Sequence, residues 1–143
     1  MKFLYSLILL ILLVSCSGNS VDDKNCRFLL DLNILPIEIN LQLPEYLNLN
    51  STGNSFYIAN AGNGGIIVTN IGFEYKAWDA ADPNYIPNTC LPLVPSGLEA
   101  TSNCGEGNKY SLVTGQALGN TSLRCALKNY SVQQTGNTLL IFN

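Results

Sequence analysis

Short runs of β-forming residues alternate with turn residues along most of this chain. The clearest is the run Ile37-Glu38-Ile39-Asn40-Leu41-Gln42-Leu43, which has the strict apolar–polar period of a strand with one buried face and ends at Pro44. Further β-rich runs occupy residues 56–59, 65–69, 73–78, 109–113, 127–133 and 138–142. Because no segment has a helical period, the sequence predicts an all-β protein, a small antiparallel sandwich or barrel.

Tight turns are predicted where Gly and Asn interrupt these runs, at residues 61–64, 70–72, 114–115 and 136–137. Both residue types adopt the positive φ that tight hairpins need. One stretch, residues 79–104, breaks the rhythm, because it carries four prolines and two cysteines. It is predicted to form long stapled loops, and loops on a rigid β scaffold are where binding sites usually lie.

The N-terminus has the features of a secretory signal. Lys2 precedes an unbroken apolar run, which is too short to span a bilayer comfortably. The segment Leu13-Val14-Ser15-Cys16 resembles a bacterial lipobox, which implies removal of residues 1–15 and lipidation of Cys16. An ordinary signal peptide with a chance cysteine, or an uncleaved membrane anchor, is the alternative.

On this interpretation, residues 1–15 are a lipoprotein signal peptide, and residues 16–27 are the lipidated cysteine and a flexible tether. Residues 28–143 are long enough for one β domain. The predicted location is the bacterial outer membrane or cell surface. The whole chain has a net charge of −3 and no basic patch, which argues against nucleic acid and anionic membrane surfaces as partners.

Four cysteines remain once lipid takes Cys16: Cys26, Cys90, Cys104 and Cys125. An even number in an exported chain favours disulfides over free thiols, with three possible connectivities. A metal site built from all four thiolates is the alternative. The chain lacks the closely spaced cysteine pairs that such sites usually have.

The order of predicted strands and loops between Tyr57 and Phe142 resembles that of the Rieske iron–sulfur domain. Tyr75-Lys76-Ala77-Trp78-Asp79 is similar to the strand before the first cluster loop of that family. Residues 110–117 resemble the aromatic strand and Gly turn after the second cluster loop, and residues 127–139 resemble the closing hairpin. The resemblance covers about two thirds of the mature chain and implies a Rieske-like β fold.

The family's cluster ligands do not carry over. A Rieske centre needs two thiolates and two imidazoles, whereas this chain has Asp82 and Asn84 in the first loop, Ser102 and Gly105 in the second, and no histidine at all. The resemblance also implies a disulfide between Cys90 and Cys104, which leaves Cys26 and Cys125 to pair or to stay as buried thiols. We expect the vacated tip to be closed by hydrogen bonds from Asp82 and Asn84 to loop backbone.

Other candidate sites have simpler structural interpretations. Asp79, Asp82 and Asn84 offer oxygens to a hard cation, but they lack calcium-loop spacing, so a turn with local side-chain hydrogen bonds is expected. Aromatic residues at alternating strand positions are expected in the core rather than in a stacking platform. These are Tyr75, Trp78 and Tyr110; Tyr85 is the exception, because it lies in a loop.

The sequence therefore predicts a lipid-anchored extracytoplasmic protein with a degenerate Rieske-like domain, no cofactor, and a role as a binding or structural module. Its predicted partners are the membrane, through the lipid, and a protein or small molecule, with no nucleic acid. No enzymatic activity is expected, because nucleophilic triads need an imidazole; paired carboxylates are the enzymatic alternative. Another alternative is electron transfer through an atypical 2Fe–2S site or a redox couple at Cys90 and Cys104.

Overall fold

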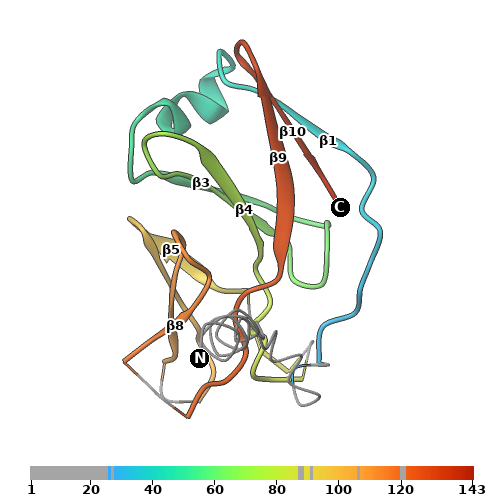
Figure 1. Cartoon of the computed structure of the whole chain (residues 1–143), viewed down its shortest axis with the longest axis vertical. Coiled ribbons are helices and arrows are strands. Elements are labelled where there is room, and N and C mark those ends of the chain that lie inside the picture. Colours follow the sequence, from blue (N-terminus) through green and yellow to red (C-terminus); the bar gives the residue numbers. More distant parts are fainter. Residues whose placement is uncertain (1–25, 27, 87–88, 91, 106, 120–121) are drawn as a thin grey trace, which may run out of the picture.

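The computed structural model describes residues 26, 28–86, 89–90, 92–105, 107–119 and 122–143. The described residues form the expected all-β fold, with two antiparallel sheets and one short 3-10 helix (Figure 1). The elements are β1 (Ile37–Asn40), η1 (Pro44–Asn50), β2 (Ser55–Ile58), β3 (Ile66–Asn70), β4 (Tyr75–Asp79), β5 (Val94–Ser96), β6 (Glu99–Thr101), β7 (Lys109–Ser111), β8 (Ala117–Leu118), β9 (Asn129–Thr135) and β10 (Thr138–Phe142).

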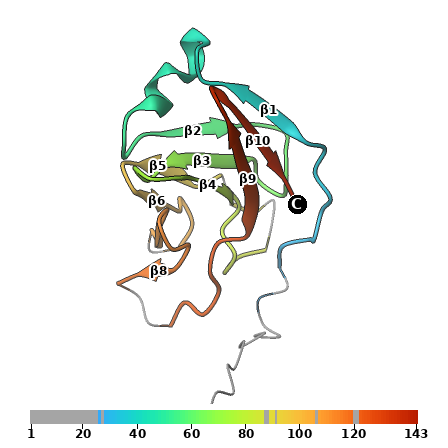
Figure 2. The same ribbon diagram turned by 45° about the horizontal axis from the view of Figure 1, so that its top comes forward.

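The larger sheet has six strands in the order β1-β10-β9-β4-β3-β2. Its two halves meet at a narrow seam, where only Ala77↔Tyr130 and Trp78↔Asn129 pair between β4 and β9. Figure 2 shows β9 and β10 running across the direction of β2, β3 and β4. The sheet therefore curls on itself and encloses side chains from both halves.

Alternation along β3 and β4 divides the interior into two cores. Ile66 and Val68 face the first core, inside the curled sheet, together with Ala77, and η1 adds Leu49 to it. Ile67 and Trp78 face the opposite way, into a second core. Both faces of β3 are therefore buried, which explains why its first three residues, Ile66 to Val68, are all apolar.

The smaller sheet, in the order β5-β6-β7-β8, is inserted in the sequence between β4 and β9. It packs on the outer face of β3 and β4 through Ala100, Tyr110 and neighbouring apolar residues. Trp78 bridges the two sheets, because its ring lies in this core and its Nε1 donates to the carbonyl of Leu112 at 2.8 Å. The segment that follows β7 is thereby held against the larger sheet.

Three features differ from the sequence prediction. Residues 79–104 are not loop throughout, because β5 and β6 form a hairpin within them; Pro95 is tolerated since β5 is an edge strand. The first strand ends at Asn40, where the Asn40 side chain accepts from the Gln42 backbone N–H and turns the chain. Pro44 then begins η1, a single 3-10 segment too short to produce a helical period in the sequence.

Residues 1–25 and Arg27 lie outside the described part of the chain. The predicted signal peptide and the predicted lipidation site, Cys16, are among them. No helix in the described ranges is long and apolar enough to cross a membrane.

Candidate functional site

Two loops at one end of the molecule contain the positions singled out by the resemblance. The first loop follows β4 and the second joins β6 to β7. The Cys90–Cys104 disulfide links them, with 5.6 Å between the two Cα atoms. The pairing that the resemblance implied is thus confirmed, and the two loops form one covalently closed tip.

Asp82 lies at the centre of this tip and is only 3% exposed. Its Oδ1 accepts from the Tyr110 hydroxyl at 2.6 Å and from the Asn84 backbone N–H at 2.9 Å. Its Oδ2 accepts from the Asn108 side-chain amide at 3.5 Å. The second loop and β7 therefore supply side-chain donors to a carboxylate that the first loop carries.

Asn84 extends this network to a third segment. Its Nδ2 donates to the Tyr110 hydroxyl at 2.8 Å and to the carbonyl of Cys125 at 3.0 Å, while its Oδ1 accepts from the Cys125 N–H at 3.2 Å. Cys125 is also bonded to Cys26, with 5.4 Å between the Cα atoms, which confirms the second expected disulfide. The N-terminal segment, the first loop and the chain before β9 thus converge at the tip.

The second loop has no free ligand at its two candidate positions. Ser102 is buried, and its hydroxyl oxygen accepts from the Cys104 N–H at 3.2 Å. Gly105 has a φ of +58°, and a Cβ added there would overlap the Tyr85 hydroxyl. A side chain as large as imidazole therefore does not fit at position 105 without displacing Tyr85.

The residues present do not fit a 2Fe–2S cluster. The four cysteines of the described chain are bonded in pairs. Of the positions that the resemblance assigns to cluster ligands, Asp82 and Ser102 hold oxygen groups already engaged in hydrogen bonds, and Gly105 has no side chain. Such clusters are held by thiolates, with imidazoles replacing two of them in Rieske centres. In the described ranges no three His, Cys, Asp or Glu side chains converge as a metal-binding group.

The tip closes partly as expected. The Asn84 backbone N–H bonds locally to Asp82, and the Asn84 side chain reaches loop backbone at Cys125. The sequence did not indicate that a buried tyrosine would bind both residues. Burial, and after it the hydrogen bond to Asp82, raise the pKa of Tyr110 well above that of an ordinary phenol. Tyr110 therefore stays protonated at neutral pH and donates to the carboxylate.

A second buried carboxylate, Asp79 at the end of β4, organises the turn between β2 and β3. It is 0% exposed and accepts from the backbone N–H groups of Asn63 (2.7 Å), Gly64 (3.0 Å) and Ala81 (2.9 Å). The Asn63 amide and the Tyr130 hydroxyl also donate to it, at 3.0 and 2.8 Å. Its oxygens are occupied, so the turn interpretation agrees with the structure better than the cation site does.

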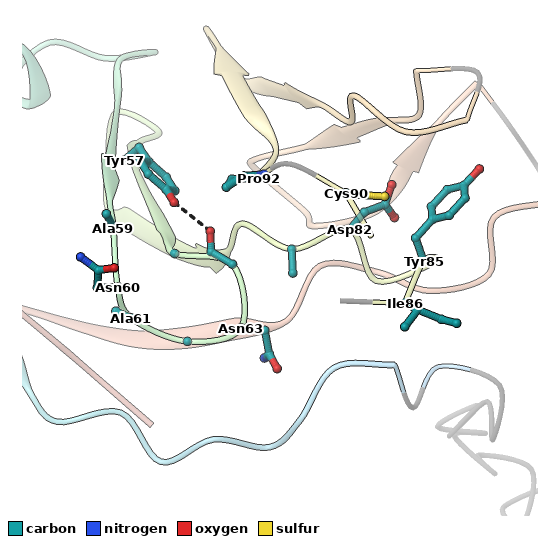
Figure 3. A pocket seen from close by; sticks show the side chains of 14 residues that line it. Tyr57, Ala59, Asn60, Ala61, Asn63, Asp82, Tyr85, Ile86, Cys90 and Pro92 are labelled. Atoms are coloured by element: carbon teal, nitrogen blue, oxygen red, sulfur yellow. Dashed lines mark hydrogen bonds between the residues drawn. The ribbon is translucent and has the colours of Figure 1, made fainter. Parts of the chain in front are cut away.

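A pocket of about 300 Å³ lies between this turn and the first loop (Figure 3). Tyr57, Asn60 and Asn63 line one side, and Tyr85 and Ile86 line the other. The Tyr57 hydroxyl donates to the carbonyl of Gly64 at 2.9 Å, which fixes the ring across the turn. The sequence identified Tyr85 as an exposed aromatic candidate but treated the Gly-rich turn only as a hairpin connection.

Aromatic positions expected in the core are there. Tyr110 is fully buried, Trp78 is nearly so, and Tyr75 packs against the first core. Only Tyr85 of the four aromatic candidates lines the pocket.

Comparison with known proteins does not add a relative from which a role could be transferred. No protein-family model matches the chain, and no curated protein matches it.

Proposed function

We propose that this chain is a lipid-anchored extracytoplasmic protein whose Rieske-like domain carries no iron–sulfur cluster and works as a binding or structural module. The observation that carries the proposal is the network joining Tyr110, Asp82 and Asn84. It occupies the place where the resemblance puts cluster ligands, and it uses their polar groups to hold loops together.

The order of elements supports the Rieske-like part of the proposal. The Tyr75–Asp79 strand leads into the first loop, the β5–β6 hairpin separates the two loops, and β7 with Tyr110 follows the second. The β9–β10 hairpin then closes the larger sheet. The Cys90–Cys104 link between the loops is the disulfide that the resemblance implies.

The pocket beside the tip is the binding site that we propose. It combines two tyrosine rings with amide groups from the β2–β3 turn, and the described residues that line it include no lysine or arginine. The carboxylate in this described lining, Asp82, already accepts hydrogen bonds from the Tyr110 hydroxyl and the Asn84 backbone N–H, both neutral donors. This chemistry suits a small uncharged polar molecule or a polar side chain of a protein partner better than an anion.

Iron and acid-labile sulfide assays on protein purified anaerobically test the absence of a cluster. We expect neither element above background, and a colourless protein. Near-stoichiometric iron with a visible charge-transfer spectrum would overturn the proposal in favour of electron transfer. Asp82→Asn is the matched variant: it keeps the side-chain size at the centre of the network, and it should leave the iron content unchanged.

Intact-mass analysis of the mature protein tests the anchor. We expect residues 1–15 to be absent and Cys16 to carry lipid, because the apolar run ends in a lipobox-like tetrapeptide. Cys16→Ser should release the protein from membranes without changing its thermal unfolding. An unmodified Cys16 in the native protein, or cleavage elsewhere, contradicts the anchor.

A further inference from the structure

Three exposed apolar side chains lie at the tip end of the domain. Phe28 is 41% exposed, Leu30 is 63% exposed and Ile86 is 60% exposed. Exposed apolar patches on such domains mark protein or membrane contacts. We call these three residues the apolar rim.

Contacts around the tip hold the apolar rim together although its members are far apart in sequence. Cys26, two residues before Phe28, is bonded to Cys125, which pairs through its backbone with Asn84. Asn84 in turn lies two residues before Ile86.

Leu30 is fixed to the same end by the pocket wall. Its backbone N–H donates to Asn63 Oδ1 at 2.9 Å, and its carbonyl accepts from Asn63 Nδ2 at 3.0 Å and from Lys128 Nζ at 3.1 Å. Asn63 and Ile86 line the same pocket (Figure 3). These three residues therefore lie at the same end of the molecule.

We propose that the apolar rim docks on the lipid bilayer that holds Cys16, so that the tip of the domain faces the membrane. The inference rests on the lipid anchor in the proposed function. Nine residues separate Cys16 from Cys26, and a tether of that length reaches at most about 35 Å when fully extended. Because it enters the domain at Cys26, the apolar rim is the part of the domain held closest to the bilayer.

The distribution of charge favours the same orientation. Among the described residues, the exposed glutamates lie away from the tip: in β1, in η1, in the β3–β4 turn and beside the β5–β6 turn (Glu38, Glu45, Glu74 and Glu99). Gly97 of that last turn accepts from Ser55, which pairs with Thr69 near the far end of β3. Near the apolar rim, Asp31 is neutralised by Lys128 at 2.6 Å. The exposed glutamates of the described residues thus do not oppose docking of this end.

Acyl chains on Cys16 already supply the affinity for the membrane, so the apolar rim would determine orientation. The fluorescence of introduced tryptophans reports which end of the domain contacts the bilayer. Ile86→Trp places a probe in the apolar rim, and Phe73→Trp places a matched probe in the β3–β4 turn, where Phe73 is also exposed. Trp78, the only native tryptophan, is buried and gives the same background in both variants.

The lipidated full-length variants are reconstituted in phosphatidylcholine vesicles with and without brominated acyl chains. We expect the Ile86→Trp emission to shift to shorter wavelength and to be quenched by bromine, whereas the Phe73→Trp emission does neither. Equal quenching of both probes, or of neither, in protein that floats with the vesicles overturns the docking and leaves the anchor standing. Protein that fails to float overturns the anchor and the docking together.

A second copy of the chain is the competing occupant of the apolar rim. In the soluble Cys16→Ser background, docking on lipid predicts an Ile86→Trp emission that does not depend on protein concentration. A blue shift that grows with protein concentration in the absence of vesicles overturns the proposal and assigns the apolar rim to self-association.

Discussion

Two buried aspartates near the start of the first loop each accept a hydrogen bond from a tyrosine hydroxyl, but their other hydrogen-bond partners differ. Asp79 has four other donors, three of them backbone N–H groups, besides the Tyr130 hydroxyl. Asp82 has only Asn84 and a long contact to Asn108 besides the Tyr110 hydroxyl. The two sites therefore differ in how far the carboxylate depends on its tyrosine.

This difference predicts unequal effects of two equivalent substitutions. Tyr110→Phe should lower the free energy of unfolding by about 2–3 kcal/mol, because it leaves a buried carboxylate and the Asn84 amide short of partners. Tyr130→Phe should cost about 1 kcal/mol, because Asp79 keeps its other donors. Urea unfolding of both variants measures the two losses. A larger loss for Tyr130→Phe would show that the tip network contributes little to stability.

Two turns, one before β8 and one between β9 and β10, each contain a glycine with positive φ, but the side chains around the two glycines differ. Gly115 and Gly136 both have positive φ, +76° and +58°. A Cβ on Gly115 would lie 2.6 Å from the Trp78 ring, while a Cβ on Gly136 would meet nothing within 4 Å. Trp78 has little room to move, since its Nε1 is bonded to Leu112.

Alanine substitutions separate backbone strain from steric overlap at these turns. Gly136→Ala should cost about 1–2 kcal/mol, the strain of a left-handed residue with a Cβ. Gly115→Ala should cost about 1–3 kcal/mol more, because the packed indole must shift. Thermal or urea unfolding gives both values, and equal losses would mean that the interface between the two sheets yields easily at Trp78.

For the entire chain, the two disulfides close loops of very different length. Cys90 and Cys104 are 14 residues apart, whereas Cys26 and Cys125 are 99 apart. Loop-closure entropy assigns about 3 kcal/mol to the shorter loop and about 4.7 kcal/mol to the longer one. Double serine variants of each pair, compared by urea unfolding, should show the larger loss at Cys26 and Cys125. The reverse order would mean that the N-terminal segment contributes little without its disulfide.

Alkaline pH should also weaken the fold as a whole. Burial, followed by hydrogen bonds to Asp82 and Asp79, raises the pKa of Tyr110 and of Tyr130 far above the value of 10.0 for a free phenol. The stability from these two protonated phenols is fully present below pH 10 and is lost as the pH rises, because the unfolded chain then releases protons that the fold retains. The Tyr110→Phe, Tyr130→Phe double variant should show a shallower decline in unfolding free energy above pH 10. An unchanged slope would contradict this assignment.

The sequence predicted the fold best where pattern and turn residues agree. The run at 138–142 coincides with β10, and Gly136 forms the turn before it. It failed at β5 and β6, because strands of three residues carry too little alternation to be recognised, and β5 also contains Pro95. These two strands pair with each other, β6 also pairs with β7, and Ala100 is buried against the second core, which are tertiary effects.

At the candidate site, the resemblance correctly predicted the Cys90–Cys104 disulfide. It did not reveal that Tyr110 and Cys125 would complete the network around Asp82 and Asn84, because those contacts join segments 26 to 41 residues apart. The pocket was equally hidden, since one wall is a turn and the other is a distant loop. The pattern of neighbouring residues does not indicate which distant segments come into contact.

The Cys26–Cys125 bond has a mechanical consequence for a protein held by its N-terminus. Tension between the tether and the C-terminal hairpin enters at Cys26 and passes through sulfur directly to Cys125. Only the residues after Cys125 can then be drawn out, while β1 to β8 lie within a covalent ring that bears no load along its length. Under the proposed anchoring, tension on the chain would therefore act first on β9 and β10 and not directly on the loops of the tip.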